Sequence, residues 1–402
     1  MTAITAIRAE QIVDSRGKPT LLATVHTEKA QGSFAVPSGA STGANEAHEL
    51  RDKDGGMSRA IANIQDIASV LIGMNVLDQN AVDKTMIELD GTAQKTHLGG
   101  NALIGVSIAC AKAAAAAQSI EVFAHLRTLA DMKPSRRVPY LYMNFINGGK
   151  HATTPLAFQE HMVVPDAESV SDSLAIVASV EKHLWLILEK KYGPEMLNTM
   201  GDEGGYVLQK GDVETPFAIL SEAIDLSGNA GRVRIAIDVA ASSFFEQGAY
   251  VVNEQRLSAD ELGKIYAELA TKYPILSIED PYEETALEDF ARLQKALPDV
   301  RVVGDDLTVT NAHEIARAGA AHAIRAVIIK PNQVGTLTET LSAMKEARTR
   351  DIDCIISHRS GDTTDDFIAD LAFAFGAFGM KAGTLRRPER RIKYERLENI
   401  SI

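Results

Sequence analysis

From about residue 140 to the end of the chain, short apolar runs alternate with amphipathic stretches whose apolar residues recur every three or four positions. The apolar runs predict β-strands, because a strand buried on both faces reads as a nearly continuous hydrophobic segment. They begin with YLYMNFI (140–146) and LAFQEHMVV (156–164). The amphipathic stretches predict helices over residues 168–192, 213–227, 258–272, 284–296, 335–349 and 386–397. This alternation is typical of an α/β protein built from parallel strands and crossover helices.

The first third of the chain has a different pattern. Residues 3 to about 36 read as three short strands separated by turn signals, and residues 57–117 read as helical. Strands followed by helices predict a small α+β domain. A looser stretch at 131–139 contains two prolines and three cations. We therefore predict an N-terminal α+β capping domain at 1–130, a linker at 131–139 and a catalytic domain at 140–402.

One charged residue stands at the polar end of each of six successive apolar runs. Their positions differ by 41, 26, 25, 28 and 23 residues, and about 25 residues are enough for one strand, one helix and two loops. The active site of a βα barrel lies where its strands end, so this row predicts a catalytic mouth. It also favours a βα (TIM-like) barrel over a doubly wound sheet. The six residues are Asp238, Glu279, Asp305, Lys330, His358 and Lys381.

Three carboxylates, Asp238, Glu279 and Asp305, end three consecutive strands. Mg²⁺ prefers hard oxygen ligands in octahedral geometry and keeps positions for water or substrate, so the trio predicts a Mg²⁺ site. Any one of them alone would more simply cap a strand end or pair with a lysine. Beside a dication, the charged forms of Lys330 and Lys381 would be disfavoured by like charge. One lysine could then act as a base and the other could hold a carboxylate.

Two loops add candidate binding groups. The segment His358-Arg359-Ser360 places a cation, a fork-shaped donor and a hydroxyl at a strand-to-helix turn, which is a favourable seat for a phosphate group. The Gly- and Ser-rich segment 37–43 lies between a strand and a helical region. It is either a lid that offers Ser41 to a metal or an ordinary turn.

Two further segments bring additional acids and a histidine. GDEGG places Asp202 and Glu203 between glycines that would let the backbone approach a ligand closely, although this segment alone would more simply be a turn. His151 and Glu160 bracket a loop, where a single histidine is usually only solvated. Taken together, the candidate groups describe a site that removes a proton next to a carboxylate, with a lysine as base and metal ions to stabilise the enolate.

Composition narrows the possible partners. The chain has 402 residues, of which 45% are apolar and 24% charged, which is typical of a globular enzyme. Its formal charge of −13 argues against nucleic acid or an anionic membrane as a partner. Cys110 and Cys354 lack metal-type neighbours, and no apolar run approaches 18 residues or forms a signal pattern. We therefore expect a cytoplasmic protein with two buried thiols.

Long segments of the chain resemble the enolase (phosphopyruvate hydratase) family over nearly the whole length. The matching segments are DSRGKPT (14–20), VPSGASTG (36–43), EAHELRD (46–52), ELDGT (88–92), GDEGG (201–205), SIEDP (277–281), DDLTVTN (305–311), NQVGTL (332–337), SHRSGDT (357–363) and MKAG (380–383). The resemblance implies reversible dehydration of 2-phosphoglycerate to phosphoenolpyruvate. It also implies an N-terminal α+β lid domain, a barrel whose second strand is antiparallel, and assembly into homodimers or homo-octamers.

The resemblance further implies a role for each site residue. Lys330 looks like the base that takes the C2 proton, Glu203 like the acid that assists loss of the C3 hydroxyl, and Glu160 like the support of that acid. The three strand-end carboxylates would bind a first Mg²⁺, and Ser41 with the substrate phosphate would complete a second site. The remaining groups would bind substrate, with His151 and His358 also taking part in catalysis; they are His151, His358, Arg359, Ser360 and Lys381.

Several positions depart from the usual enolase pattern, among them Lys18, Lys150, Ser243 and Pro388. The changes at residues 153–155, His161 and residues 206–208 cluster on the loops around His151, Glu160 and Glu203. One interpretation is neutral drift in an ordinary enolase. The other is a site retuned for a related phosphorylated or phosphonylated carboxylate, as in the enolase-like carboxyphosphonoenolpyruvate synthases of phosphonate natural-product pathways. A non-catalytic scaffold would have lost the acid, the base or the metal ligands, all of which are present.

Overall fold

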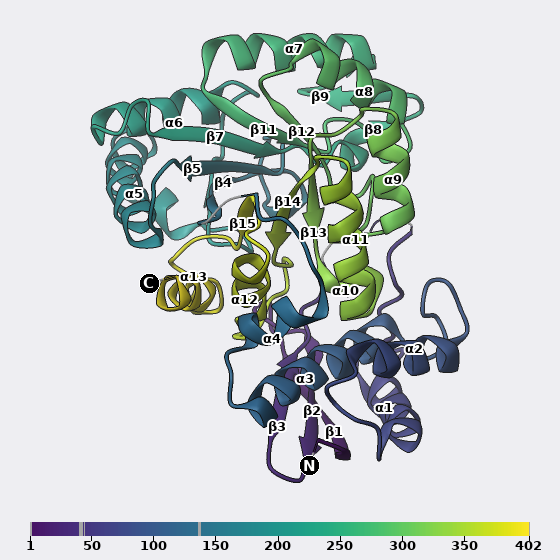
Figure 1. Ribbon diagram of the computed structural model, residues 1–402. Helices are drawn as coiled ribbons and strands as arrows, with labels where there is room; N and C mark the ends of the chain where they lie inside the picture. Colours follow the sequence, from purple (N-terminus) through teal and green to yellow (C-terminus); the bar gives the residue numbers. More distant parts are fainter. Residues whose placement is uncertain (1, 40–42, 44, 136–137, 402) are drawn as a thin grey trace.

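A closed βα barrel forms the larger part of the computed structural model, which describes residues 2–39, 43, 45–135 and 138–401 (Figure 1). The pairing of β15 with β4 closes the ring, and the short strand β6 (Tyr206–Val207) pairs with β4 outside it. The predicted barrel is therefore confirmed. Its strands are β4 (Tyr140–Asn147), β5 (Glu160–Pro165), β7 (Val233–Asp238), β11 (Ile275–Glu279), β12 (Arg301–Gly304), β13 (Ala326–Ile329), β14 (Asp353–Ser357) and β15 (Gly379–Lys381).

Strand β5 runs against its neighbours, as the family resemblance implied. It pairs antiparallel with both β4 and β7, whereas the other neighbouring barrel strands are parallel. The first residue of β5, Glu160, consequently lies opposite Asn147 and Asp238, the last residues of β4 and β7. The reversal brings a carboxylate from the start of a strand to the same end of the barrel as the strand-end residues.

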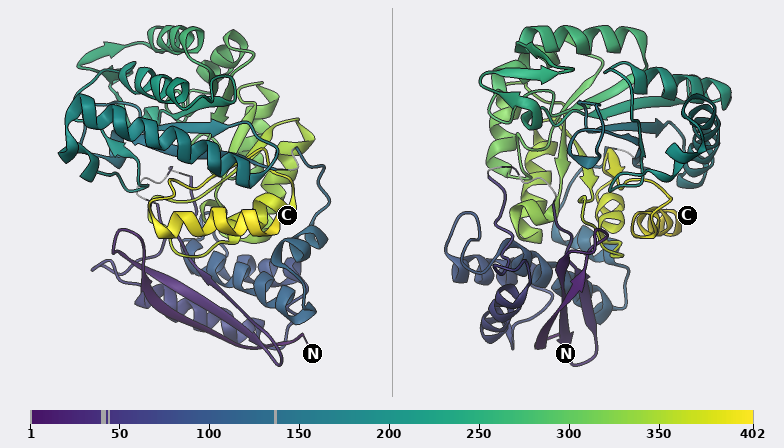
Figure 2. Two further views of the ribbon diagram at one scale, coloured as in Figure 1. Left: turned by 90° about the vertical axis from the view of Figure 1, so that its left-hand side faces the viewer. Right: turned by 180° about the vertical axis from the view of Figure 1, so that it is seen from behind.

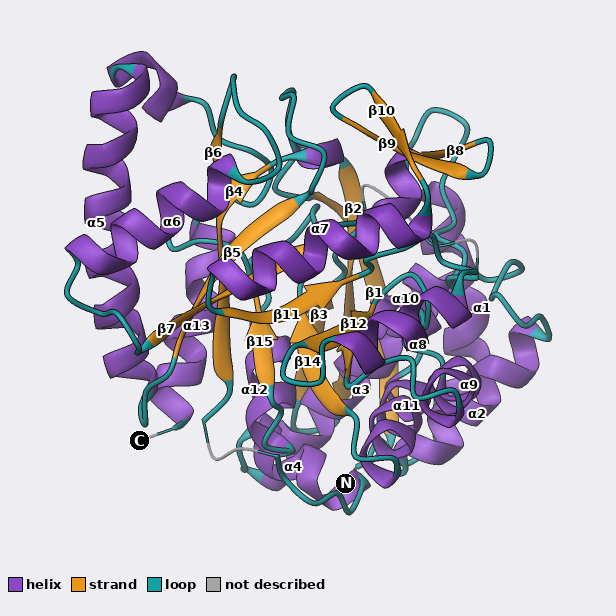
Figure 3. Ribbon diagram, turned by 90° about the horizontal axis from the view of Figure 1, so that it is seen from above, coloured by secondary structure: helices purple, strands orange, loops and turns teal. Residues whose placement is uncertain are grey.

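The helices form the outer layer of the barrel (Figure 3). Each predicted helical stretch forms a helix within a few residues of its expected bounds, and α9 and α12 belong to the same layer. The interval of 41 residues between Asp238 and Glu279 is long because a small antiparallel meander, β8 (Phe245–Glu246), β9 (Ala249–Val252) and β10 (Gln255–Leu257), precedes α7. The helices are α5 (Val170–Tyr192), α6 (Thr215–Leu226), α7 (Ala259–Lys272), α8 (Leu287–Ala296), α9 (Ala312–Ala320), α10 (Pro331–Val334), α11 (Leu337–Thr349), α12 (Phe367–Ala374) and α13 (Pro388–Ile400).

The N-terminal segment forms the expected three-stranded antiparallel sheet, β1 (Ile4–Val13), β2 (Pro19–Thr27) and β3 (Gln31–Ala35), followed by α1 (Ser58–Leu71), α2 (Gln79–Asp90), α3 (Gly100–Gln118) and α4 (Val122–Leu129). Backbone and helix approach closely here, since a Cβ at Gly32 would lie 2.2 Å from the backbone nitrogen of Ala113 in α3. Within the described residues, α3 alone is long and apolar enough to cross a membrane, and 83% of that stretch is buried. It is therefore a core helix, and the expectation that no apolar run approaches 18 residues is wrong for this segment.

The N-terminal domain packs on the barrel where the strands end (Figure 2). The backbones of Ser38 and Gly361 exchange hydrogen bonds of 2.7 and 2.9 Å just after β14 ends. A side chain at position 361 would not fit, because a Cβ there would lie 2.2 Å from a carboxylate oxygen of Asp14. This contact fixes the start of the 37–43 loop beside the catalytic mouth. Ion pairs at 2.9 and 2.7 Å also join the two parts, Lys95–Glu339 and Lys112–Asp365.

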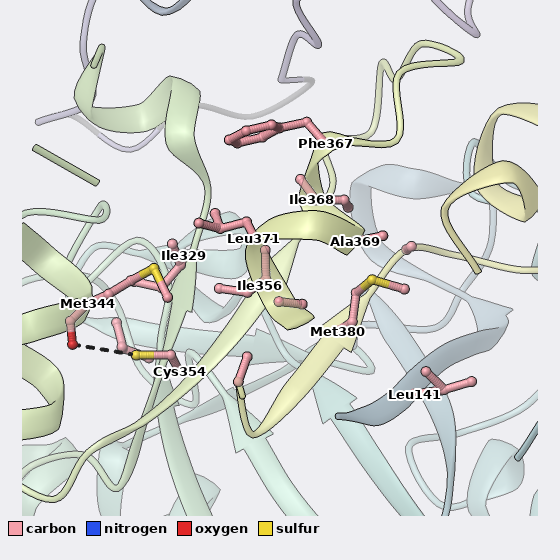
Figure 4. Packing of buried hydrophobic residues seen from close by; sticks show 14 of the residues in the cluster. Leu141, Ile329, Met344, Cys354, Ile356, Phe367, Ile368, Ala369, Leu371 and Met380 are labelled. Carbon is pink, nitrogen blue, oxygen red and sulfur yellow. Dashed lines mark hydrogen bonds between the residues drawn. The ribbon is translucent and has the colours of Figure 1, made fainter. Parts of the chain in front are cut away.

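A continuous hydrophobic core supports the strands beneath α12 (Figure 4). Ile356 of β14 and Met380 of β15 are fully buried there with Leu371 of α12. Cys354 belongs to the same core, and Cys110 is buried in α3; both thiols are free, as expected. Burial raises the pKa of Cys354 to about 11, so this thiol behaves as a small apolar side chain.

Candidate active site

The six charged residues of the row do lie at successive strand ends. Asp238, Glu279 and Lys381 are the last residues of β7, β11 and β15. The other three follow their strands directly, Asp305 after β12, Lys330 after β13 and His358 after β14. One cavity is lined by most of the predicted side chains: Glu160, Glu203, Asp238, Asp305, Lys330, His358, Arg359, Ser360 and Lys381.

Lys381 lies among three buried carboxylates. Its Nζ is 2.9 and 3.0 Å from the two oxygens of Glu279, 3.2 Å from Asp238 Oδ2 and 3.3 Å from Glu160 Oε2. Burial would lower the pKa of Lys381, but these carboxylates outweigh burial and hold the pKa well above its usual value. Conversely, burial and the neighbouring charge of Asp238 raise the pKa of Glu279.

Among the residues that the structure describes, Lys330 forms an ion pair with one carboxylate, that of Asp305. Burial would raise the pKa of Asp305, but Lys330 outweighs it and the pKa is lowered. In the same way, Asp305 outweighs burial and raises the pKa of Lys330. Gln333 Nε2 donates to the second oxygen of Asp305 at 3.0 Å, and Thr310 Oγ1 donates to Gln333 Oε1 at 2.7 Å. Thr310 Oγ1 also accepts from the backbone nitrogen of Lys330 at 2.9 Å, so Lys330 and Gln333 hold this carboxylate directly and Thr310 holds both of them in turn.

The expectation that a neutral amine becomes accessible at these lysines concerns the site with a dication bound, and it stays a prediction. Without that cation the groups that surround them are carboxylates, which favour the charged amine of both Lys330 and Lys381. The carboxylates of Asp238, Glu279 and Glu160 converge on the ammonium group of Lys381, so they are arranged to hold positive charge.

Glu160, Glu203 and His358 form a second buried group. His358 Nε2 lies 3.1 Å from Glu203 Oε1, and Asn144 Nδ2 donates to Glu203 Oε2 at 3.0 Å. Burial and then the charge of Glu203 raise the pKa of Glu160 well above its usual value. Two carboxyl groups coupled in this way hold a proton more tightly than either would alone. Burial also lowers the pKa of His358 to about 4, so its ring is neutral near pH 7.

The glycines of GDEGG make room for other protein atoms. A Cβ at Gly205 would lie 2.5 Å from Asn147 Oδ1, and a Cβ at Gly204, whose φ is +87°, would lie 2.3 Å from Thr384 Oγ1. The loop that carries Glu203 is therefore wedged between β4 and the segment after β15.

Arg359 and Ser360 extend the site from the end of β14, and both line the cavity. Arg359 Nη1 lies 2.9 Å from Glu46 Oε2 and donates to Asn332 Oδ1 at 3.0 Å. Glu46 comes from the N-terminal domain, so that domain contributes directly to the position of the candidate phosphate-binding arginine. Two predicted groups, Ser41 and the side chain of His151, lie outside the described residues.

The donor set at the mouth fits a hard divalent cation. Asp238, Glu279 and Asp305 offer only oxygen, which matches Mg²⁺. A tighter acidic group lies beside them, Asp280, Asp305 and Asp306, whose oxygens are within 4.8 Å of one another. Asp280 is less suited to bind a cation itself, because its two oxygens accept the backbone N–H groups of residues 305 and 306 at 2.9 and 2.7 Å. It holds Asp305 in place instead.

Some functional neighbours had no role assigned from the sequence. Asp280 and Asp306 stand next to predicted ligands within SIEDP and DDLTVTN, so adjacency was an available signal. Asn144 was visible as a polar residue within an apolar strand. Glu46 and Gln333 are polar residues of ordinary loop and helix segments, and only the fold shows that they reach the site.

Comparisons with known proteins give one consistent result. The family model described as "Enolase, N-terminal domain" matches residues 4–126, and "Enolase, C-terminal TIM barrel domain" matches residues 135–401. A protein named enolase from Methanopyrus kandleri is 43% identical over 413 residues, covering 100% of this chain and 96% of the relative. Enolases from Methanothrix thermoacetophila and Methanosarcina barkeri are each 42% identical, covering 99% of this chain and 95% and 94% of the relatives.

Proposed function

The chain belongs to the enolase family and is a hydro-lyase that dehydrates 2-phosphoglycerate to phosphoenolpyruvate, and we propose that the charged cluster at the barrel mouth carries out this reaction. The alternative of a phosphonate-pathway substrate is not favoured, because full-length similarity is to proteins named enolase. The observation that carries the proposal is the convergence of the candidate base, the candidate acid and two of the three candidate cation ligands, Asp238 and Asp305, on one cavity.

Lys330 is the proposed base for the C2 proton. It projects into the cavity from the end of β13, and its amine pairs with Asp305. The base must be neutral when it accepts the proton, so Lys330 has to leave this ion pair as the substrate binds. A lysine whose charge is balanced by one carboxylate is suited to such exchange, because any cation that binds Asp305 removes the reason for the lysine to stay charged.

Glu203 is the proposed acid for departure of the C3 hydroxyl. It enters the cavity from the 201–205 loop, whereas Lys330 enters from β13, so the two groups approach a bound substrate from different elements. Glu160 supports the acid step by sharing a buried carboxyl environment with Glu203, in which burial and the charge of Glu203 raise the pKa of Glu160. His358 lies against Glu203 and completes this group with the predicted His151.

Substrate anions are bound by the remaining cations. Arg359, held by Glu46 from the N-terminal domain, and Ser360 are the proposed phosphate-binding groups. Lys381 is the proposed partner of the substrate carboxylate. Two Mg²⁺ sites are proposed, the first held by Asp238, Glu279 and Asp305 and the second completed by Ser41 and substrate. Bound Mg²⁺ supplies positive charge that stabilises the negative charge developing on the substrate carboxylate.

Turnover of variants tests these roles. Purified protein with Mg²⁺ and 2-phosphoglycerate should raise phosphoenolpyruvate absorbance, with turnover in the usual enzyme range of about 1–10³ s⁻¹. Lys330→Ala and Glu203→Gln should each lower kcat by at least about 10²-fold, the contribution typical of a general base or acid. The matched control Lys345→Ala removes an exposed lysine of α11 and should leave kcat unchanged. Unchanged kcat in Lys330→Ala would remove the assigned base.

The quaternary and domain assignments are also proposals. We propose a cytoplasmic homo-oligomer, a dimer or an octamer, on the strength of the family resemblance. Light scattering of the purified protein measures this, and a monomer at micromolar concentration would contradict it. The division into 1–130, 131–139 and 140–402 is supported by the absence of regular secondary structure at residues 130–135 and 138–139. Limited proteolysis should cut first in that segment.

A further inference from the structure

Arg390, in the first turn of α13, is the largest fully buried side chain in the described part of the chain, with 0% exposure. Arginine is rarely buried unless several partners satisfy its donors. Nη1 of Arg390 lies 2.6 Å from His358 Nδ1, 2.6 Å from the carbonyl oxygen of Arg359 and 3.1 Å from Asp362 Oδ2. Nη2 donates to the carbonyl oxygen of Ser360 at 2.6 Å. One guanidinium therefore contacts each residue of the candidate phosphate seat.

These contacts determine where the hydrogen of the His358 ring lies. A guanidinium has only donors, so the ring nitrogen that faces it must accept. Nδ1 of His358 is that acceptor, and a neutral imidazole then carries its hydrogen on Nε2. Nε2 lies 3.1 Å from Glu203 Oε1. A second ring hydrogen, on Nδ1, would point at the positive charge of Arg390, which disfavours the imidazolium form as well.

The Nε2 side of the His358 ring faces the proposed acid. Asn144 donates to Glu203 Oε2 at 3.0 Å, and His358 Nε2 lies 3.1 Å from Oε1 without forming an aligned hydrogen bond, so each carboxyl oxygen has one nitrogen neighbour. These neighbours come from different elements and together limit the rotation of the carboxyl group. If the ring hydrogen moved to Nδ1, the unprotonated Nε2 would face Glu203 Oε1 as a second acceptor, which would push this oxygen away.

Charge balance alone does not explain Arg390. Lys393, one turn further along α13, already lies 3.3 Å from Asp362 Oδ2 and donates to the carbonyl oxygen of Thr363 at 2.8 Å. Lys393 therefore anchors the same helix to the same loop without contacting His358. This gives the chain a natural matched control.

We propose that Arg390 is a positioning residue for the acid step: it fixes His358 as the Nε2–H tautomer and so holds the carboxyl group of Glu203 in its working orientation. Arg390 also holds the backbone of residues 359 and 360 through their carbonyl groups. The effect on catalysis rests on the proposed role of Glu203 as the acid. The effect on the tautomer does not depend on that role.

The tautomer can be read directly in the Mg²⁺-loaded wild-type enzyme. Histidine labelled with ¹⁵N, observed through the carbon-bound ring protons, distinguishes a protonated from an unprotonated ring nitrogen. The signals of His358 are assigned by their loss in His358→Gln. We expect a protonated Nε2 and an unprotonated Nδ1 throughout pH 6–8. A protonated Nδ1, alone or in an imidazolium, would overturn the proposal even if no Arg390 variant folds.

Two variants then connect the tautomer with turnover. Arg390→Lys keeps a charge but loses the planar fork; we expect both His358 tautomers to be populated and kcat to fall by roughly 10- to 100-fold, with KM changing less. Lys393→Met should leave the tautomer pure and kcat within about twofold, whatever its effect on stability. Equal losses of kcat in the two variants, or a pure Nε2–H tautomer with unchanged kcat in Arg390→Lys, would contradict the proposal.

A third variant separates this proposal from the function on which it rests. In a Glu203→Gln background, Arg390→Lys should cause little further loss of kcat, because both changes act on one step. Full turnover of Glu203→Gln alone would remove Glu203 as the acid and leave the tautomer assignment standing. A further loss as large as that in the wild-type background would show that Arg390 acts through something other than Glu203.

Discussion

Replacing His161 by phenylalanine should make the protein more resistant to acid. His161 lies on β5 with 1% exposure, packed against Phe158 and Phe217 at ring-centroid distances of 6.4 and 5.4 Å. Its Nδ1 is 3.4 Å from the carbonyl oxygen of Ile146, and its Nε2 has no hydrogen-bond partner among the described residues. Burial lowers the pKa of His161 to about 4. The ring therefore stays neutral in the folded protein while it becomes charged in the unfolded chain.

The direction of the effect follows from proton binding. An unfolded histidine has a pKa of about 6.5, so the unfolded state binds more protons than the folded state between roughly pH 6.5 and pH 4. The free energy of unfolding must therefore fall as the pH falls through this range. With a pKa of about 4 in the folded state, His161 accounts for a loss of about 2 kcal/mol between pH 7 and pH 5. Phenylalanine keeps the ring packing and cannot be protonated, so this loss of unfolding free energy is absent in the variant.

Urea unfolding at pH 7 and pH 5, followed by circular dichroism, measures the difference. The wild type should lose about 2 kcal/mol more unfolding free energy than His161→Phe between the two pH values. Carboxylates that titrate in both proteins cancel in this comparison. His313→Gln is the matched control, because its side chain is 84% exposed and should leave the pH dependence unchanged. Identical pH dependence of the wild type and His161→Phe would refute the reasoning.

Three further changes test the loops, the substrate seat and the cation. Gly204→Ala places a Cβ at a φ of +87° and 2.3 Å from a side-chain oxygen, whereas the Cβ of Gly55→Ala, at a φ of +86°, meets nothing within 4 Å. Calorimetry should show Gly204→Ala to be less stable than Gly55→Ala by at least about 1 kcal/mol. Glu46→Gln removes the charged partner of Arg359, so KM for 2-phosphoglycerate should rise about tenfold or more, while Glu88→Gln, a 67% exposed control, should have the KM of the wild type. EDTA should abolish turnover and Mg²⁺ should restore it; activity that resists EDTA would remove the metal assignment.

The barrel could be predicted from the sequence because its buried parallel strands read as apolar runs with a charged residue at each polar end. The end of the apolar run and the type of the residue both indicate the site at Asp238, Glu279 and Lys381, because the last residue of each strand is also a candidate site residue. The direction of β5 could not be predicted from the apolar pattern, because a buried antiparallel strand has the same pattern as a parallel one. Only the family resemblance indicated it.

The supporting residues were harder to predict because their contacts are distant in the sequence. Glu46 reaches Arg359 across the boundary between the two parts of the chain. Arg390 lies in a helix whose sequence is mostly charged, and a single buried arginine has no periodic signal there. The charge around Lys381 was hard to predict for a related reason, since it depends on three carboxylates brought together by folding.

The assignment of Lys330 as base and Glu203 as acid is tested most directly by following the C2 proton of 2-phosphoglycerate in D₂O by NMR. Loss of the C2 proton needs only the base, whereas formation of phosphoenolpyruvate needs the base and the acid. Glu203→Gln should therefore exchange the C2 proton for deuterium while forming little phosphoenolpyruvate, and Lys330→Ala should do neither. Exchange at the wild-type rate in Lys330→Ala would contradict the assignment.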